Sequence, residues 1–184
     1  WKQSTPQYRK LVSGLLAFAL FNSSDIFLLL KAKEAGLGDT ALIGVYIFYN
    51  LIYALFAYPL GVLADKIGVR NMFIFGLGIF SIVYFGMSAS SSIYAIAGLF
   101  FLYGIYGAAT EGVSKAWISN ITDKMETATA IGTYTAFQSI CALIASSFAG
   151  LIWFRFGSQV TFTITGLATL VIMLYFIIAR WDRY

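Results

Sequence analysis

Long apolar runs alternate along the chain with short segments that collect its polar and charged residues. Each run is close to the ~20 residues that a helix rising about 1.5 Å per residue needs in order to cross ~30 Å of hydrocarbon. The runs are continuous, whereas a transmembrane β-barrel shows alternating segments of ~10 residues. The pattern therefore predicts an all-α membrane protein with six transmembrane helices, over about residues 11–30, 41–63, 72–89, 93–116, 128–153 and 160–179.

The composition supports a membrane protein and excludes several classes of chemistry. Of the 184 residues, 60% are hydrophobic and 11% are charged, against about 25% charged residues in a typical soluble domain. The chain has no histidine, which excludes Ser-His catalysis and zinc or haem held by imidazole. Its one cysteine, Cys141, lies inside an apolar run and has no second cysteine to pair with. We expect no catalytic residues, no bound metal and no cofactor.

The basic residues flank the apolar runs instead of forming a patch, so we expect no nucleic-acid partner. Six crossings place eight bases on one face and three on the other, with Lys115 inside a span. The richer face carries both termini, and its bases are Lys2, Arg9, Lys10, Lys66, Arg70, Lys124, Arg180 and Arg183. The other face carries Lys31, Lys33 and Arg155. The positive-inside rule predicts that the face with both termini is cytoplasmic.

The first predicted span contains an acid within the apolar run. Asn22 and Asp25 are three residues apart, which would put them on one helical face. An ionised carboxylate in hydrocarbon is costly, so Asp25 must face protein or water, or hold a proton. The alternative is an acid near the helix end that extends to the membrane surface beside Lys31 and Lys33.

The second span carries a row of hydrogen-bonding side chains. Tyr46, Tyr49, Asn50 and Tyr53 follow the spacing i, i+3, i+4 and i+7, which places them on one helical face. Such a face suits the wall of a substrate cavity, because tyrosine joins an apolar ring to a polar tip. It also suits ordinary hydrogen bonding between neighbouring helices.

The fourth and fifth spans extend the predicted cavity wall. Glu111 and Lys115 are four residues apart, in the order that favours an ion pair on one helix. The pair can be a static bridge, or a relay whose partners change as the protein moves. The other polar side chains assigned to the wall are Tyr103, Tyr106, Tyr134 and Gln138. The third and sixth spans contain no charge, and we expect them to be outer, lipid-facing support.

The turn between the second and third spans carries the most specific motif. It is the one place where an acid, bases and two glycines sit between long apolar runs. Residues 61–70 resemble the G-x-L-a-D-[RK]-x-G-[RK]-[RK] loop of the major facilitator superfamily of secondary transporters. The matching residues are Gly61, Leu63, Asp65, Lys66, Gly68 and Arg70, while Val69 stands where the family usually has a base. Residues 21–25, 49–54 and 110–116 are similar to strings in the C-terminal six-helix half of bacterial members.

The resemblance implies half of a major facilitator fold, built from two inverted three-helix repeats. Residues 1–10 would be the end of a cytoplasmic connector, and residues 11–184 the six-helix bundle. The implied partners are a small-molecule substrate, the lipid bilayer and an N-terminal six-helix half of the same transporter. The implied location is the plasma membrane, namely the inner membrane of a bacterium.

The resemblance also implies a mechanism. Secondary active transport would proceed by alternating access and be coupled to protons, with Asp25, Glu111 and Lys115 as coupling candidates. Asp65 with Arg70 would secure the cytoplasmic gate. Since the polar walls hold no inward cluster of Arg or Lys, we expect a neutral or amphipathic substrate and not a phosphorylated one.

Two other classes of function are open. A six-helix module can serve as a non-transporting scaffold or channel, because a cavity wall and a dimer interface share the same one-dimensional pattern. An intramembrane aspartyl protease would use Asp25 together with the G-x-G-D sequence at residues 36–39. Asp39 opens the second span, however, where we expect it to be an N-cap at the membrane surface. We therefore expect that the protein is not an enzyme.

Overall fold

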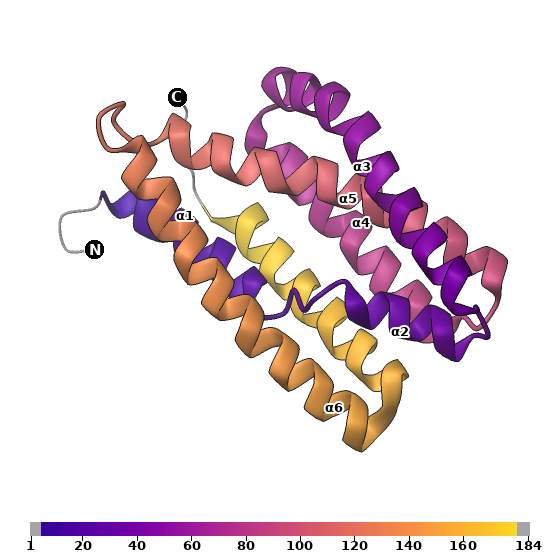
Figure 1. Ribbon diagram of the computed structural model, residues 1–184. Coiled ribbons are helices and arrows are strands. Elements are labelled where there is room, and N and C mark those ends of the chain that lie inside the picture. Colours follow the sequence, from indigo (N-terminus) through magenta and orange to yellow (C-terminus); the bar gives the residue numbers. More distant parts are fainter. Residues whose placement is uncertain (1–4, 180–184) are drawn as a thin grey trace.

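The computed structural model describes residues 5–179, and within this range the chain forms helices and loops without a β-strand. Six helices follow one another in Figure 1. Their bounds are Pro6–Ala19 (α1), Ile26–Glu34 (α2), Asp39–Ile67 (α3), Val69–Ala89 (α4), Ile93–Asn120 (α5) and Thr127–Ile178 (α6). The all-α prediction is confirmed. The six helices do not coincide one by one with the six predicted spans.

The predicted first span is not a continuous helix. α1 ends at Ala19 and α2 begins at Ile26, and residues 20–25 form a non-helical connection that we call the break segment. Its Ser24 hydroxyl accepts a hydrogen bond from the Ile26 amide at 3.4 Å. Ser, Asn and Asp side chains offer the backbone such alternatives to helical hydrogen bonding. The prediction that Asn22 and Asp25 share one helical face is therefore wrong.

The predicted fifth and sixth spans are both contained in α6. The chain turns back at Gly157, whose φ of 84° and ψ of 172° are non-helical. A positive φ favours glycine, because a Cβ would clash with the backbone there. Figure 1 shows the chain reversing at this point. The first half of α6 (residues 127–156) and its second half (residues 158–178) are thus two separate crossings, as predicted.

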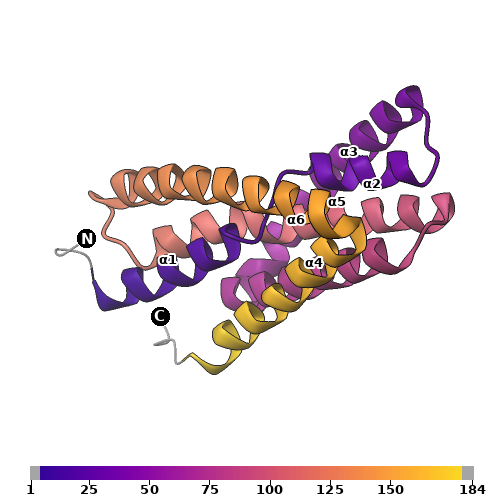
Figure 2. The same cartoon turned by 90° about the horizontal axis from the view of Figure 1, so that it is seen from below.

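Hydrogen bonds between distant residues show which connections share an end of the bundle. Tyr8 donates to the Ala130 carbonyl at 2.9 Å, and Tyr175 donates to the Lys10 carbonyl at 2.9 Å. These contacts bring the start of α1, the start of α6 and the end of α6 together at what we call the terminal end (Figure 1 and Figure 2). Ser88 donates to the Gln159 carbonyl at 3.0 Å, which places the α4–α5 connection beside the Gly157 turn at the opposite, hairpin end.

The bases of the described residues divide between these two ends as predicted. Arg70 contacts the end of α6, and Lys124 lies in the α5–α6 loop at the terminal end. Lys31 donates to Ser158 at 3.4 Å at the hairpin end. Lys2, Arg180 and Arg183 lie outside the described residues. α3, α4, α5 and α6 each have the length and apolar composition to cross a membrane, while α1 and α2 are shorter.

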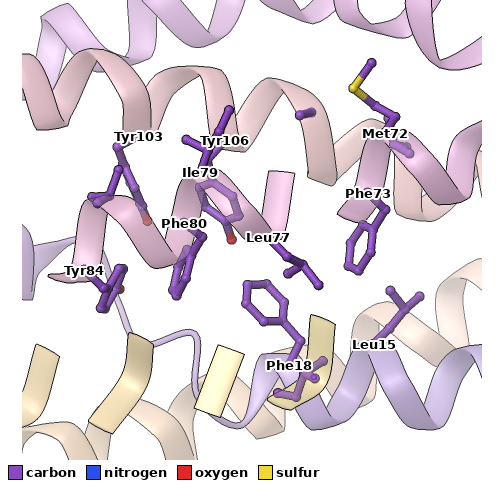
Figure 3. Packing of buried hydrophobic residues seen from close by; sticks show 14 of the residues in the cluster. Leu15, Phe18, Met72, Phe73, Leu77, Ile79, Phe80, Tyr84, Tyr103 and Tyr106 are labelled. Carbon is purple, nitrogen blue, oxygen red and sulfur yellow. The ribbon is translucent and has the colours of Figure 1, made fainter. Parts of the chain in front are cut away.

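The expectation that the third span is lipid-facing support is wrong. That span is α4, and its Leu77, Phe80 and Val83 are fully buried between α5 and α6. Figure 3 shows Phe18, Phe80 and Tyr106 facing one another where α1, α4 and α5 meet. The second half of α6 also buries one face, including Phe162. An uncharged span such as residues 72–89 suits a packed interior as well as lipid, because lipid tails are as apolar as the interior.

The outer apolar surface is formed largely by α3 and by both halves of α6. Ile47 and Leu55 of α3 are 61% and 59% exposed, and Leu143 and Phe154 of α6 are 70% and 85% exposed. α3 nevertheless packs closely on α5 at Gly104, where a Cβ would lie 2.7 Å from the Tyr49 carbonyl oxygen. This close approach positions the tyrosines of both helices around the break segment.

Candidate functional site

Asp25 lies at the end of the break segment, between α3 and α5. Its Oδ2 accepts a hydrogen bond from the Tyr49 hydroxyl at 2.5 Å, and its Oδ1 accepts one from the Tyr103 hydroxyl at 2.5 Å. Both carboxylate oxygens are thereby bound to protein. The alternative in which Asp25 extends to the surface beside Lys31 and Lys33 is wrong, because those bases contact Ser158 and Asp39 instead.

An aromatic cluster surrounds this carboxylate. Tyr49 and Tyr103 are buried, and their ring centroids are 5.5 Å apart at 67°. The Tyr103 ring lies 5.3 Å from that of Tyr106, one turn further along α5. Rings packed in this way exclude water and strengthen the hydrogen bonds that they enclose. α3, α5 and the break segment are therefore held together at one acid.

Asn22, also in the break segment, makes a second connection to α5. Its Nδ2 donates to the Tyr106 hydroxyl at 3.0 Å. Its Oδ1 is buried and has no hydrogen-bond partner within residues 5–179. A buried amide oxygen without a donor is costly, so this atom is available to a bound donor.

A polar cavity of about 260 Å³ adjoins Asn22. Its walls come from the break segment, α1, α4, α5 and the first half of α6, and they consist of Phe18, Asn22, Phe73, Tyr106, Thr110, Glu111, Ser114, Lys115, Tyr134 and Gln138. The structure thus brings together six of the predicted site residues, namely Asn22, Tyr106, Glu111, Lys115, Tyr134 and Gln138.

Four of the wall residues were absent from the predicted site. Thr110 and Ser114 belong to the helix face of Glu111, and their i, i+4 spacing is the signal that identifies them. Phe18 and Phe73 have no sequence signal that separates them from ordinary core residues. Their ring centroids lie 6.3 Å apart in an edge-to-face contact.

The predicted ion pair between Glu111 and Lys115 is not formed. Within residues 5–179, side-chain ion pairs join Lys31 to Glu34 at 3.8 Å and Lys33 to Asp39 at 2.8 Å, both near the hairpin end. Glu111 and Lys115 are exposed residues that line the polar cavity. The prediction of a static ion pair is therefore wrong for this structure. The opposite charges of Glu111 and Lys115 instead line the same cavity.

The predicted row of polar side chains on α3 is divided among different surroundings. Tyr49 binds Asp25, and the ring of Tyr53 faces Gly107 of α5. Asn50 donates to the carbonyl of Tyr46 in its own helix at 2.8 Å. Tyr46 lines a separate apolar pocket of about 320 Å³ between α2 and α3. The α3 row and Tyr103 therefore do not line the polar cavity within the described residues.

The turn that carries the family motif joins α3 to α4 at Gly68, where φ is 92°. Asp65 and Lys66 are exposed in the last turn of α3. Arg70 donates from Nε to the Phe176 carbonyl at 3.0 Å and from Nη2 to the Ile177 carbonyl at 2.6 Å. A base is favoured there, because the last carbonyls of a helix have no partner within it. Asp65 and Arg70, which we expect to secure the gate, form no ion pair with each other among the described residues.

The acids required by the protease alternative are separated. Gly38 is the N-cap of α3, so the expectation that Asp39 would be the N-cap is wrong, and Asp39 instead pairs with Lys33. Asp25 contacts α3 at Tyr49, ten residues after Asp39 and roughly 15 Å along the helix. Two carboxylates must share one site in an aspartyl protease, so this arrangement argues against that class.

Apolar helices that enclose a polar cavity define a polytopic membrane protein. Residues 11–184 match the family model of the Major Facilitator Superfamily, and the chain belongs to this superfamily. It is 34% identical over 151 residues to the uncharacterized MFS-type transporter MJ1317 of Methanocaldococcus jannaschii. The match covers 79% of this chain and 38% of that protein, so the matched part spans well under half the length of this relative. The predicted family is confirmed.

Proposed function

We propose that the chain forms the C-terminal half of a secondary transporter, which carries a small molecule across the membrane by alternating access. Membership of the superfamily supports transport as the general activity. The observation that carries the proposal is the polar cavity between the helices. Polar side chains inside an otherwise apolar bundle are expensive, and they mark pathways for polar molecules.

Asp25 is the proposed site of proton coupling. Its two oxygens connect the break segment to α3 through Tyr49 and to α5 through Tyr103. A protonated carboxyl becomes a donor and loses acceptor capacity, so it no longer binds both hydroxyls equally well. Protonation would therefore loosen the segment that also positions Asn22 at the cavity. Glu111 and Lys115 stay candidates for coupling, because they are the charged residues of the cavity wall.

The partner of this bundle is proposed to be an N-terminal six-helix half, with the lipid bilayer around both. The exposed apolar side chains of α3 and of the first half of α6 support a large contact with other apolar groups. We propose that the terminal end is cytoplasmic, because the bases at that end outnumber those at the hairpin end. The plasma membrane, in the form of a bacterial inner membrane, is the proposed location. Two inverted three-helix repeats, with the bundle spanning residues 11–184, stay predictions.

The turn at residues 61–70 is proposed to take part in the cytoplasmic gate. Arg70 binds the end of α6 from the start of α4, and these hydrogen bonds hold one side of the turn in place. Asp65 is exposed in the same turn and can contact a neighbouring helix end. Gate opening would then break contacts of Asp65 while those of Arg70 persist.

The transport proposal can be tested without knowing the substrate. Membrane vesicles containing the complete protein are incubated with a cell extract under an imposed proton gradient, and their contents are compared by untargeted mass spectrometry. Vesicles prepared in the same way without the protein are the control. We expect one compound or a few related compounds to accumulate only with the unaltered protein, and to be lost with a protonophore. Identical contents would contradict transport and favour the scaffold.

A further inference from the structure

We propose that the polar cavity binds a small zwitterion, with an ammonium group and a carboxylate a few bonds apart and an apolar group beside them. This inference rests on the proposed transport function, because it assigns the substrate class of the same cavity. It also narrows the sequence-based expectation of a neutral or amphipathic substrate. Three properties of the cavity walls support it.

The first property is a pair of opposite charges at short separation. Glu111 and Lys115 occupy successive turns of α5, where Cβ atoms are about 5–6 Å apart, and both line the cavity. Within residues 5–179 no ion pair joins them. A zwitterion presents two opposite charges at a comparable separation. Its ammonium group would face Glu111 and its carboxylate would face Lys115, so that each side chain gains a partner of opposite charge.

The second property is the buried Oδ1 of Asn22, which has no partner within residues 5–179. The other end of that amide is held by the Tyr106 hydroxyl, so the oxygen is the atom left for a ligand. An oxygen acceptor suits an ammonium group and does not suit a carboxylate. On the α6 wall, Tyr134 and Gln138 carry a hydroxyl and an amide that can donate to the carboxylate.

The third property is the apolar part of the wall, formed by the rings of Phe18 and Phe73. These rings favour an uncharged group on the same ligand. A single base among the wall residues argues against phosphate esters, which are usually held by several bases. The volume of about 260 Å³ suits a molecule of modest size. An α-amino acid with an apolar side chain has all three features.

The test measures binding to the complete purified protein by isothermal titration calorimetry. The probes are L-alanine, L-leucine and L-phenylalanine, each compared with the amine that lacks its carboxylate and the acid that lacks its ammonium group. We expect at least one amino acid to bind ten or more times more tightly than both of its analogues. The proposal is overturned if no amino acid binds, or if an analogue binds as tightly as its parent.

Two variants separate charge recognition from a general effect on folding. Glu111→Gln should weaken amino acid binding roughly 10- to 100-fold and leave the acid analogue as the better ligand. Lys115→Gln should weaken it similarly and leave the amine analogue as the better ligand. The matched controls are Glu126→Gln and Lys124→Gln, two exposed residues at the terminal end, and these should bind like the unaltered protein. Equal weakening of every probe in both cavity variants would contradict the proposal.

The outcomes distinguish this inference from the transport proposal. If the vesicle experiment identifies a transported compound without an ammonium–carboxylate pair, transport stands and the zwitterion assignment fails. If amino acids bind with the crossed pattern of the two variants but no compound accumulates, the assignment stands and transport fails.

Discussion

Tyr103 of α5 donates a hydrogen bond to Oδ1 of Asp25 across the gap between α5 and the break segment, at 2.5 Å. The two residues are 78 positions apart in the chain. The carboxylate is the link between a non-helical segment and two long helices, since its other oxygen binds Tyr49 of α3. A change at this acid therefore acts on three elements together.

Removing the charge of Asp25 should uncouple transport from protons. Asp25→Asn keeps an acceptor for one tyrosine and cannot exchange a proton, so we expect flux that no longer depends on the proton gradient. Tyr103→Phe keeps the acid and removes one donor, so we expect slower flux that still depends on pH. The measurement is substrate uptake into vesicles with and without an imposed gradient. Retained gradient dependence in Asp25→Asn would rule out coupling at this residue.

Asp65→Asn should slow transport while the protein stays inserted in the membrane. The side chain is exposed and makes no ion pair among the described residues, so the folded bundle should not depend on its charge. The measurement is uptake rate per inserted protein, with Glu126→Gln as control, because Glu126 is also exposed and makes no ion pair among the described residues. Unchanged uptake in Asp65→Asn would remove this residue from the proposed gate.

Arg70→Met should loosen the last turn of α6. The substitution removes two charge-assisted hydrogen bonds to carbonyls at a helix end, which we expect to cost about 1–3 kcal/mol. Hydrogen exchange of the amides at residues 173–178 should become faster, with little change in α5. Lys66→Met, which removes an exposed base of the same turn, is the control. Equal exchange in both variants would mean that Arg70 does not stabilise this end.

Gly104→Ala should disturb the packing of α3 on α5. The new methyl would lie 2.7 Å from the Tyr49 carbonyl oxygen and 2.8 Å from Cβ of Ile52, so the two helices must move apart. We expect a loss of about 1–3 kcal/mol in the free energy of unfolding. Gly112→Ala is the matched control in the same helix, because nothing lies within 4 Å of its added methyl. Thermal unfolding of both variants in detergent measures the difference.

Much of the fold follows from the pattern of the sequence. The length of the apolar runs predicts six crossings, and glycine with polar residues near position 157 predicts the reversal inside α6. The break at residues 20–25 was not predicted. Asn22 and Asp25 are spaced as on a helix, yet such side chains also compete for backbone hydrogen bonds, and the spacing alone does not distinguish these outcomes.

The candidate site was predicted in part, for a similar reason. Four polar residues of the wall stand in apolar runs, namely Glu111, Lys115, Tyr134 and Gln138. Exposing a polar side chain to lipid costs free energy, and this cost predicts that they face a cavity. The partners of Asp25 and Arg70 come from helices far away in the sequence, so no local pattern identifies them. The central position of α4 was not predicted, because lipid and the protein interior both favour apolar side chains, and the sequence does not distinguish the two environments.

Alternating access is the central claim, and labelling of one cavity residue from each side of the membrane tests it most directly. Once Cys141 and any cysteine in the rest of the protein are replaced by Ser, Gln138→Cys provides a single thiol on the cavity wall. Its reaction with a membrane-impermeant maleimide is measured in right-side-out and inside-out vesicles at two pH values. The account predicts labelling from both sides of the membrane. When the pH changes, the labelling rate should rise in one type of vesicle and fall in the other. Labelling from one side only, unchanged by pH, would contradict it.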